Sequence, residues 1–253
     1  AMGLRGTDAA KQMADMVLRD DQFSTIVAAV EQGRIIFANI RKSVMFMLCT
    51  NLAEIIAVTL SSLAGAPIPL KPLQILFLNV LTDVFPALAL GVGPGIREVM
   101  RHKPRDPGES VLSREHWLAI GGWSVVISAC VLSALTFALH WLGFEESKAV
   151  TVSFLTLGFC KLWFVVNLRD CGTPVWNNDI VRNPWIWGAI VFCVGLLLAA
   201  VYWPWLSDLL QTSEPGMNGW LLILGLSLVP AMLGLVAPCI RFYSSGQQAE
   251  KKR

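Results

Sequence analysis

The chain has 253 residues, of which 55% are hydrophobic and only 15% are charged, and its formal net charge is +2. Because charged residues alone make up about a quarter of ordinary soluble domains, this composition excludes a soluble globular protein and indicates one surrounded mostly by lipid. Nothing in it points to nucleic acid as a partner. The six cysteines show no CxxC spacing and mostly lie in apolar runs, which favours small core residues over disulfides or a metal site.

The first 42 residues differ from the rest, because they mix charged and short apolar residues as a soluble segment does. They contain no basic stretch followed by an apolar core, so a signal peptide is not predicted. We expect a cytosolic segment here, in which residues 16–18 (MVL) could form one buried strand.

A long helix is predicted from Phe23, because the following residues favour helix, lack proline and include a single glycine, Gly33, up to Cys49. We expect it to run straight into the membrane and to end near Ala64. At ~1.5 Å per residue such a rod is roughly 60 Å long, about twice the thickness of the hydrocarbon layer. It would link the cytosol to the membrane interior.

Six apolar stretches approach the roughly 20 residues that a spanning helix needs. They cover 43–64, 72–91, 117–141, 150–168, 185–203 and 219–240. The predicted fold is therefore an all-α, polytopic transmembrane bundle in a lipid bilayer. Basic residues gather before the first stretch, after the second and at the end of the chain: Arg34, Arg41, Lys42, Arg97, Arg101, Lys103, Arg105, Arg114, Arg241, Lys251, Lys252 and Arg253. By the positive-inside rule, both termini are expected to be cytoplasmic.

Polar side chains interrupt the first two stretches and are costly in lipid. Asn51 and Glu54 are three residues apart, and Asn79, Thr82 and Asp83 are spaced by three and four, so each helix presents one polar stripe. The turn between the helices lies about midway between the two stripes. An antiparallel hairpin is therefore expected to bring both stripes to a similar depth.

The two stripes together offer two carboxylates, two amide oxygens and a hydroxyl, which is the hard-oxygen set that binds Ca²⁺, Mg²⁺, Mn²⁺ or Na⁺. Pro86 removes a backbone donor and disfavours a regular helix around Val84 and Phe85, which could expose carbonyl oxygens beside the stripe. The alternative is that the amides and the hydroxyl only bond helix to helix. The two acidic residues, Glu54 and Asp83, favour an ion site over packing alone.

With the motifs TNLAE at 50–54 and LNVLTDVFPALALG at 78–91, the sequence resembles the carboxyl-terminal third of a P-type cation-transporting ATPase, in the calcium-pump (P2) branch. The resemblance implies that the six spans are the family's fifth to tenth. It also implies that Asn51, Glu54, Asn79, Thr82 and Asp83 are ion ligands. The implied organisation is a remnant of the cytosolic phosphorylation domain at 1–24, a stalk helix at 25–42, a membrane transport domain at 43–240 and a cytosolic tail at 241–253.

The resemblance further implies alternating access driven by phosphorylation of an aspartate, with ATP and Mg²⁺ acting only in the complete protein. The family's phosphorylation loop, its nucleotide-binding and actuator domains and its first four spans would lie before Ala1. The chain alone is therefore expected neither to hydrolyse ATP nor to pump, and these missing parts are its expected partners. The family also implies the plasma membrane of a bacterium. A channel or an accessory subunit without enzyme activity is the alternative.

Ca²⁺ is the preferred cation for this oxygen-rich site, while Mg²⁺, Mn²⁺, Na⁺ and H⁺ remain open. In calcium pumps with two sites, the eighth span carries an acidic ligand in the segment corresponding to LTLGFCKLWFVVN here, which contains no carboxylate. A second divalent site is therefore not expected. Lys161 in that segment could be a built-in counter-ion that neutralises Glu54 or Asp83 when the cation leaves. Alternatively, it could snorkel to the cytoplasmic surface.

Overall fold

The computed structural model describes residues 1–95, 99–100, 110–169 and 178–236, and the described part is helical throughout its membrane region. The helices are α1 (Asp8–Met13), α2 (Phe23–Leu63), α3 (Pro72–Leu78), α4 (Val84–Gly91), α5 (Arg114–His140), α6 (Glu146–Phe164), α7 (Pro184–Tyr202), α8 (Pro204–Leu210) and α9 (Gly216–Val236). A π-helical turn, η1 (Asn79–Asp83), joins α3 to α4, and a 3₁₀ turn, η3 (Val165–Leu168), extends α6.

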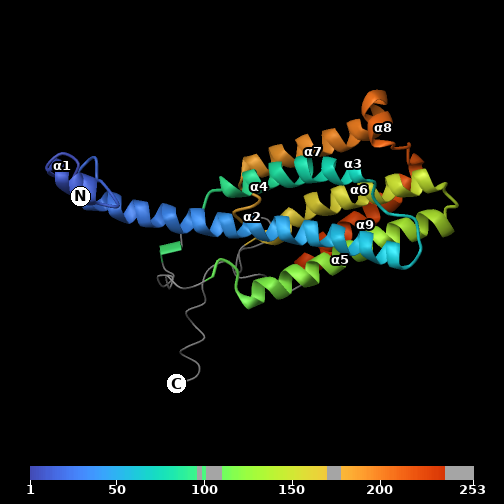
Figure 1. The fold of residues 1–253 in the computed structure, drawn as a ribbon, viewed down its shortest axis with the longest axis horizontal. Coiled ribbons are helices and arrows are strands. Elements are labelled where there is room, and N and C mark those ends of the chain that lie inside the picture. Colours follow the sequence, from blue (N-terminus) through green and yellow to red (C-terminus); the bar gives the residue numbers. More distant parts are fainter. Residues whose placement is uncertain (96–98, 101–109, 170–177, 237–253) are drawn as a thin grey trace, which may run out of the picture.

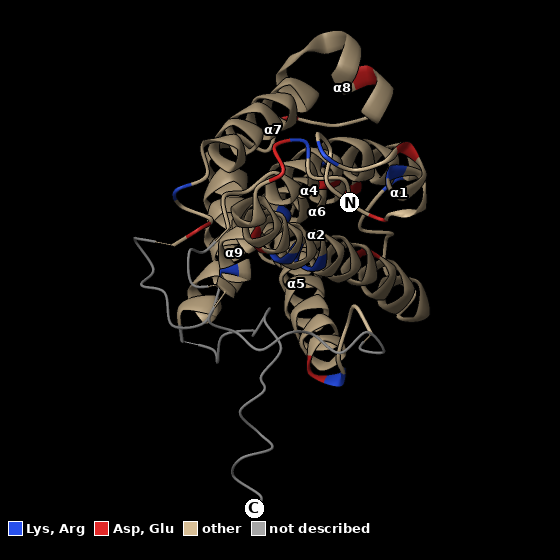
Figure 2. Cartoon of the chain, turned by 90° about the vertical axis from the view of Figure 1, so that its left-hand side faces the viewer, with Lys and Arg blue, Asp and Glu red and all other residues tan. Residues whose placement is uncertain are grey.

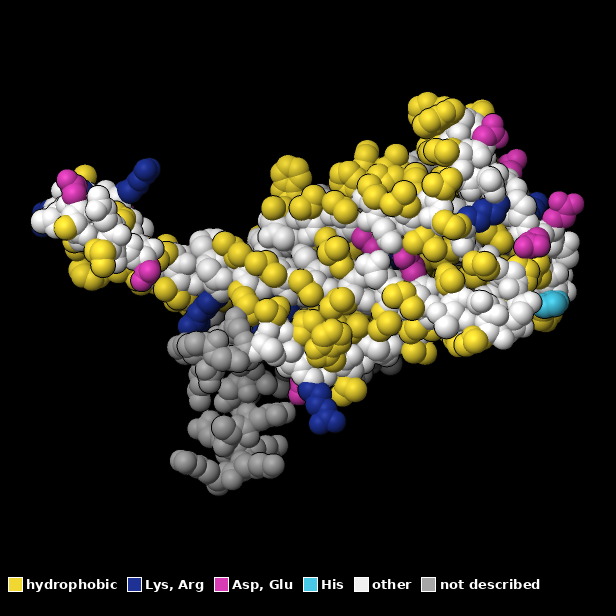
Figure 3. Space-filling view, in the orientation of Figure 1, with side chains coloured by type: hydrophobic (Ala, Val, Ile, Leu, Met, Phe, Trp, Pro, Cys, Tyr) yellow, Lys and Arg dark blue, Asp and Glu magenta, His cyan; other side chains and the backbone are white. Residues whose placement is uncertain are grey.

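Six of these segments are long and apolar enough to cross a membrane, namely Phe23–Leu63, Pro72–Gly91, Arg114–His140, Glu146–Leu168, Pro184–Tyr202 and Gly216–Leu235. They lie side by side along one direction (Figure 1), and apolar side chains are spread over the face of the bundle that Figure 3 shows. Seen from the end that carries the N-terminus, basic and acidic residues are sparse among the helices (Figure 2). The prediction of an all-α integral membrane bundle of six spans is confirmed.

Helix α2 is one continuous rod of 41 residues that projects well beyond the bundle towards the N-terminus (Figure 1), as the sequence predicts. It ends where Gly65 adopts a positive φ of 65°, a conformation that glycine adopts without steric cost. The hydroxyl of Ser61 then donates to the carbonyl of Pro67 and fixes the turn into the second span.

The N-terminal segment forms only the short helix α1 and a few tight contacts. Leu18 is buried and pairs with Met2 through a single isolated bridge. The carboxylate of Asp21 accepts from the backbone N–H groups of Leu4 and Arg5. The strand predicted at 16–18 is therefore wrong, because one bridge replaces the ladder of hydrogen bonds that a strand needs.

Helix α6 occupies the centre of the bundle and packs mainly against α5 and α9, which also contact each other. In its most apolar stretch 89% of the residues are buried, against 28–44% in the other five spans. Most of its side chains therefore face protein rather than lipid. A polar group on α6 needs a protein partner for this reason.

The second span is interrupted, but not where the sequence suggested. Val84 and Phe85 open the regular helix α4, and the irregular π-turn lies one turn earlier, over η1. Pro86 has no N–H to donate to the carbonyl of Thr82, so its effect falls on the preceding turn. The resulting wide turn contains three of the predicted ligands, Asn79, Thr82 and Asp83.

Candidate cation site

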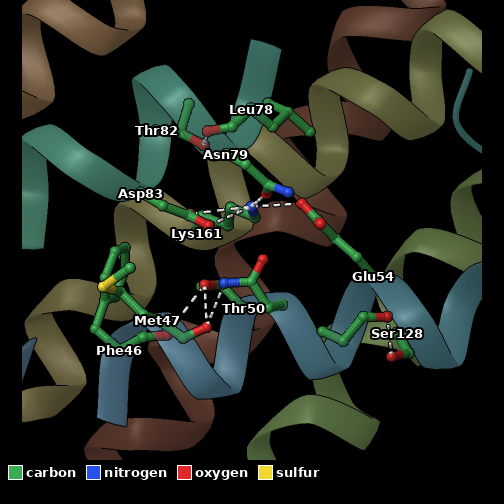
Figure 4. Close-up of polar contacts among 12 residues, drawn as sticks. Phe46, Met47, Thr50, Glu54, Leu78, Asn79, Thr82, Asp83, Ser128 and Lys161 are labelled. Atoms are coloured by element: carbon green, nitrogen blue, oxygen red, sulfur yellow. Dashed lines mark hydrogen bonds and ion pairs between the residues drawn. The ribbon is translucent and has the colours of Figure 1, made fainter. Parts of the chain in front are cut away.

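Three spans contribute side chains to one buried polar cluster, in which Lys161 from α6 lies between Glu54 of α2 and Asp83 of η1 (Figure 4). Its Nζ atom is 2.5 Å from Glu54 Oε1 and lies 3.0 and 3.1 Å from the two carboxylate oxygens of Asp83. It also donates to Asn79 Oδ1 at 3.3 Å. Glu54, Asn79 and Asp83 therefore reach one point at the same depth.

The cluster is almost entirely removed from solvent, since the Lys161 side chain is 0% exposed, Asp83 1% and Glu54 5%. Burying an isolated charge costs several kcal/mol, so opposite charges in contact are what makes this arrangement tolerable. Two carboxylates and one ammonium nevertheless leave a formal charge of −1 when all three are ionised. The ammonium lies inside the cluster, so Lys161 does not snorkel to the surface in this structure.

The two remaining predicted ligands bond to their own helices. Thr82 Oγ1 donates to the carbonyl of Leu78 at 2.8 Å (Figure 4), and Asn51 Nδ2 donates to that of Met47 at 2.8 Å. Within the described part of the chain, neither side chain bonds to Lys161. Both bonds use donors, so the hydroxyl and amide oxygens of these residues keep their acceptor capacity.

Sequence reasoning missed three buried hydroxyls around the site. Thr50 precedes Asn51 on α2, and its Oγ1 donates to the carbonyls of Phe46 and Met47 at 3.1 Å each. Ser124 and Ser128 of α5 donate to backbone carbonyls of α2. The sequence does give a sign of the two serines, because their spacing of four places them on one face of a mostly apolar span.

Close packing fills the face of α6 one turn before Lys161. A Cβ added to Gly158 would lie 2.9 Å and 3.0 Å from the two Cδ atoms of Leu197, and 3.3 Å from Leu78 Cδ2. A side chain larger than glycine would therefore force neighbouring groups to shift.

In the described ranges, no group of three or more His, Cys, Asp or Glu side chains is placed to hold a metal ion.

A second polar region lies where α2, the end of α4 and residues 178–183 meet, and we call it the junction. Lys42 of α2 forms a buried ion pair with Asp179. The carbonyls of the last turns of α4 and of the residues after it accept from side chains of the two other segments: Ala87 O from Ser43, Ala89 O from Asn183, and Gly91 O and Gly93 O from Asn39. Two of these acceptors, Ala89 O and Gly91 O, are among the last four carbonyls of α4, which a helix leaves without a partner inside itself.

A six-span bundle that encloses acidic, amide and ammonium groups between its helices is typical of membrane proteins that move ions. The chain belongs to the family of cation-transporting ATPases, because the family model for "Cation transporting ATPase, C-terminus" matches residues 67–238. The resemblance seen in the sequence is thereby confirmed.

Relatives of known name match over most of the chain. A calcium-transporting ATPase of Bacillus subtilis is 35% identical over 238 residues, covering 92% of this chain and 26% of the relative. Calcium-transporting ATPase type 2C member 2 of Mus musculus is 34% identical over 232 residues, covering 90% and 24% respectively. The P-type sodium-transporting ATPase4 of Toxoplasma gondii is 46% identical over 141 residues, covering 55% of this chain and 10% of the relative. The chain spans about a quarter of the length of the calcium-transporting relatives.

Proposed function

We propose that this chain is the membrane transport part of an ATP-driven cation pump and that Ca²⁺ is the cation it carries. The observation that carries the proposal is that Glu54, Asn79 and Asp83 all contact the side-chain ammonium of Lys161. The oxygens that surround this ammonium are of the kind that replaces the water shell of a cation. The calcium-transporting relatives support Ca²⁺.

In this proposal Lys161 is a resident counter-ion, and it holds the two carboxylates when no transported cation is present. Binding of a cation then requires the ammonium to withdraw or to share the carboxylates. Glu54, Asn79 and Asp83 are the first ligands to become available, and the free oxygens of Asn51 and Thr82 complete the set on this chain. The π-turn favours this exchange, because its backbone can adjust without breaking a long helix.

The charge of the cluster bears on which cation it accepts. With Lys161 counted, the formal charge of the cluster is −1, so one monovalent cation neutralises it, whereas Ca²⁺ would leave a net charge of +1. One further carboxylate, from the spans that the family resemblance places before Ala1, would bring the cluster to −2 and make it neutral with Ca²⁺. The sodium-transporting relative makes Na⁺ the second candidate, and this candidate needs no further acid.

ATP, Mg²⁺ and the phosphorylated aspartate belong to the complete protein, and α2 is the part of this chain that would receive its motion. We assign residues 1–24 to the phosphorylation domain, 25–42 to the stalk, 43–240 to the transport domain and 241–253 to the tail. The basic residues that flank the spans favour cytoplasmic termini, and the Bacillus relatives favour a bacterial plasma membrane. Much of the second connection and the whole tail lie outside the described residues.

The test is ATP-dependent uptake by the full-length protein in sealed vesicles, with Ca²⁺, Mg²⁺, Mn²⁺ and Na⁺ compared. We expect saturable Ca²⁺ uptake that falls at least ~100-fold in Asp83→Asn, because a ligand and half of the acidic charge are lost. Glu146→Gln is the matched control, since this exposed acid at the start of α6 lies outside the cluster. Unchanged uptake in Asp83→Asn contradicts the proposal. Passive leak through the chain alone in liposomes, abolished by the same change, favours a channel.

A further inference from the structure

Two serines of α5 reach across to the backbone of α2 at the level of the cation site. Ser124 Oγ donates to the carbonyl of Cys49 at 2.9 Å, and Ser128 Oγ donates to that of Ala53 at 2.8 Å. Both serines are buried. Because each helix advances by four residues between the two bonds, the contacts repeat in register along the α2–α5 interface.

These contacts are not needed to satisfy the hydroxyls. The carbonyls four residues earlier in α5 lie 2.6 Å from Ser124 Oγ and 2.7 Å from Ser128 Oγ, which is the usual way a serine is accommodated in a membrane helix. Because a hydroxyl has only one proton, each serine shares it between this carbonyl and the one on α2. Among the described residues, the hydroxyl of Thr136 on the same helix bonds only within α5, to Leu132 O and Ser133 O. The contact with α2 is therefore one half of a shared hydrogen bond, and it depends on where the two serines lie.

The carbonyl bound by Ser128 belongs to the residue directly before Glu54. The carboxylate of Glu54 in turn holds Lys161 on α6, and α6 packs against the same helix α5. Helices α2, α5 and α6 thus form a closed set of contacts around Glu54. Asn79 and Asp83 reach the cluster from η1 instead.

We propose that Ser124 and Ser128 are positioning residues, whose hydroxyls fix the height and rotation of α2 so that Glu54 faces Lys161 and the cation. This inference rests on the proposed transport function and adds a role for α5 to it. Ligands held by a rigid neighbour bind a cation more tightly, because less order has to be created on binding. The cation then enters mainly by rearrangement of η1, while Glu54 keeps its position relative to α5.

The experiment uses the full-length pump with Ser124→Ala and Ser128→Ala combined. Alanine keeps the close helix approach that small residues allow but removes the bonds to α2. We expect the cation concentration for half-maximal uptake to rise about 10-fold, while the maximal rate stays within about twofold. Restoring Ser128 alone should recover most of the affinity, because it is the serine next to Glu54. Thr136→Val is the matched control and should leave both values unchanged.

Unchanged affinity in the double variant, with uptake still abolished by Asp83→Asn, would mean that only small size matters at these positions and would overturn the inference. If Asp83→Asn also left uptake intact, the proposed function itself would fail. Should the double variant not fold, Ser128→Ala and Ser128→Gly replace it. Both single variants lack the hydroxyl, so both should lose affinity together.

Discussion

Lys161 and Lys42 are both buried and both join α2 to another part of the chain, but their surroundings differ in charge. Lys161 lies inside the bundle and holds two carboxylates and an amide, so that cluster keeps an excess negative charge. Lys42 lies at the junction, where it forms an ion pair with Asp179, and amide and hydroxyl groups nearby bind carbonyls at the end of α4. An ion pair among satisfied backbone groups suits a fixed joint, whereas a cluster with two carboxylates around one ammonium suits a site that accepts a cation.

Removing the Lys161 charge is the change that should separate the two regions most clearly. In Lys161→Gln the cluster loses its resident cation and its formal charge falls from −1 to −2, so a transported cation no longer competes for the carboxylates. We expect the apparent affinity for the cation to rise by about tenfold or more, with more protons bound in the empty state. Uptake measured against cation concentration gives the apparent affinity, and proton counter-transport measured alongside it reports the bound protons.

Two control variants test whether the effect comes from losing the positive charge at position 161. Lys161→Arg retains the positive charge and should stay close to the parent protein in stoichiometry. Lys148→Gln removes a lysine from the other end of α6, where the ammonium lies over the ring of Phe144, and should change neither value. Equal affinity and equal proton movement in Lys161→Gln would remove the counter-ion role.

The sequence predicted the helices that carry the two lysines but not the contacts that the lysines make. Length and hydropathy predicted the spans and the long α2 rod, and the stripe of Asn79, Thr82 and Asp83 followed from helical spacing. The place of Lys161 could not be predicted, because depth in the membrane alone permits both snorkelling and contact with Glu54. What decides between them is that α6 is the central helix, and this depends on packing between distant parts of the chain.

The same limit applies to other features. Pro86 predicted an irregular second span, yet the opening falls on the turn that holds Asp83, because a proline affects the carbonyl four residues earlier. The pairing of Lys42 with Asp179 joins residues 137 apart, so no local pattern reports it. The bonds from Ser124 and Ser128 likewise depend on which helix lies next to α2.

At the junction the expected effect is on stability rather than on cation affinity. Asp179→Asn removes the charge of the Asp179 carboxylate from the buried ammonium of Lys42, which should lower the free energy of unfolding by about 3 kcal/mol. Combining Lys42→Met with Asp179→Leu removes both charges and should recover all but about 1 kcal/mol of that loss. Thermal unfolding in detergent measures the stability, and uptake by the full-length protein should show an unchanged cation affinity.

Asp208→Asn serves as the control, because this exposed acid of α8 should change the stability by no more than about 0.5 kcal/mol. If Asp179→Asn behaved like this control, the buried pair would not hold the junction together. If it shifted cation affinity instead of stability, the distinction between the two regions would be lost.

The smallest effect is expected at Asp21, an acid outside the membrane spans that is only partly covered. The backbone N–H of Leu4 is the main cause that lowers the pKa of Asp21 below its ordinary value of 3.8, and that of Arg5 adds to it. Because the folded pKa lies below the unfolded one, the carboxylate stabilises this segment above pH 3.8, and the contribution is lost as the pH falls through the lowered pKa.

Asp21→Ala should therefore release the Leu4 and Arg5 amides at neutral pH. It removes their acceptor and also places alanine at a φ of 55°, which a non-glycine residue adopts only at a cost. Hydrogen exchange of the peptide containing these amides measures the effect, with Asp8→Ala as the control at an exposed acid. Since the segment touches neither Lys161 nor Lys42, exchange elsewhere should not change. Faster exchange that spread into the membrane helices would show that the N-terminal segment is coupled to the bundle, and that the stalk transmits disorder as well as motion.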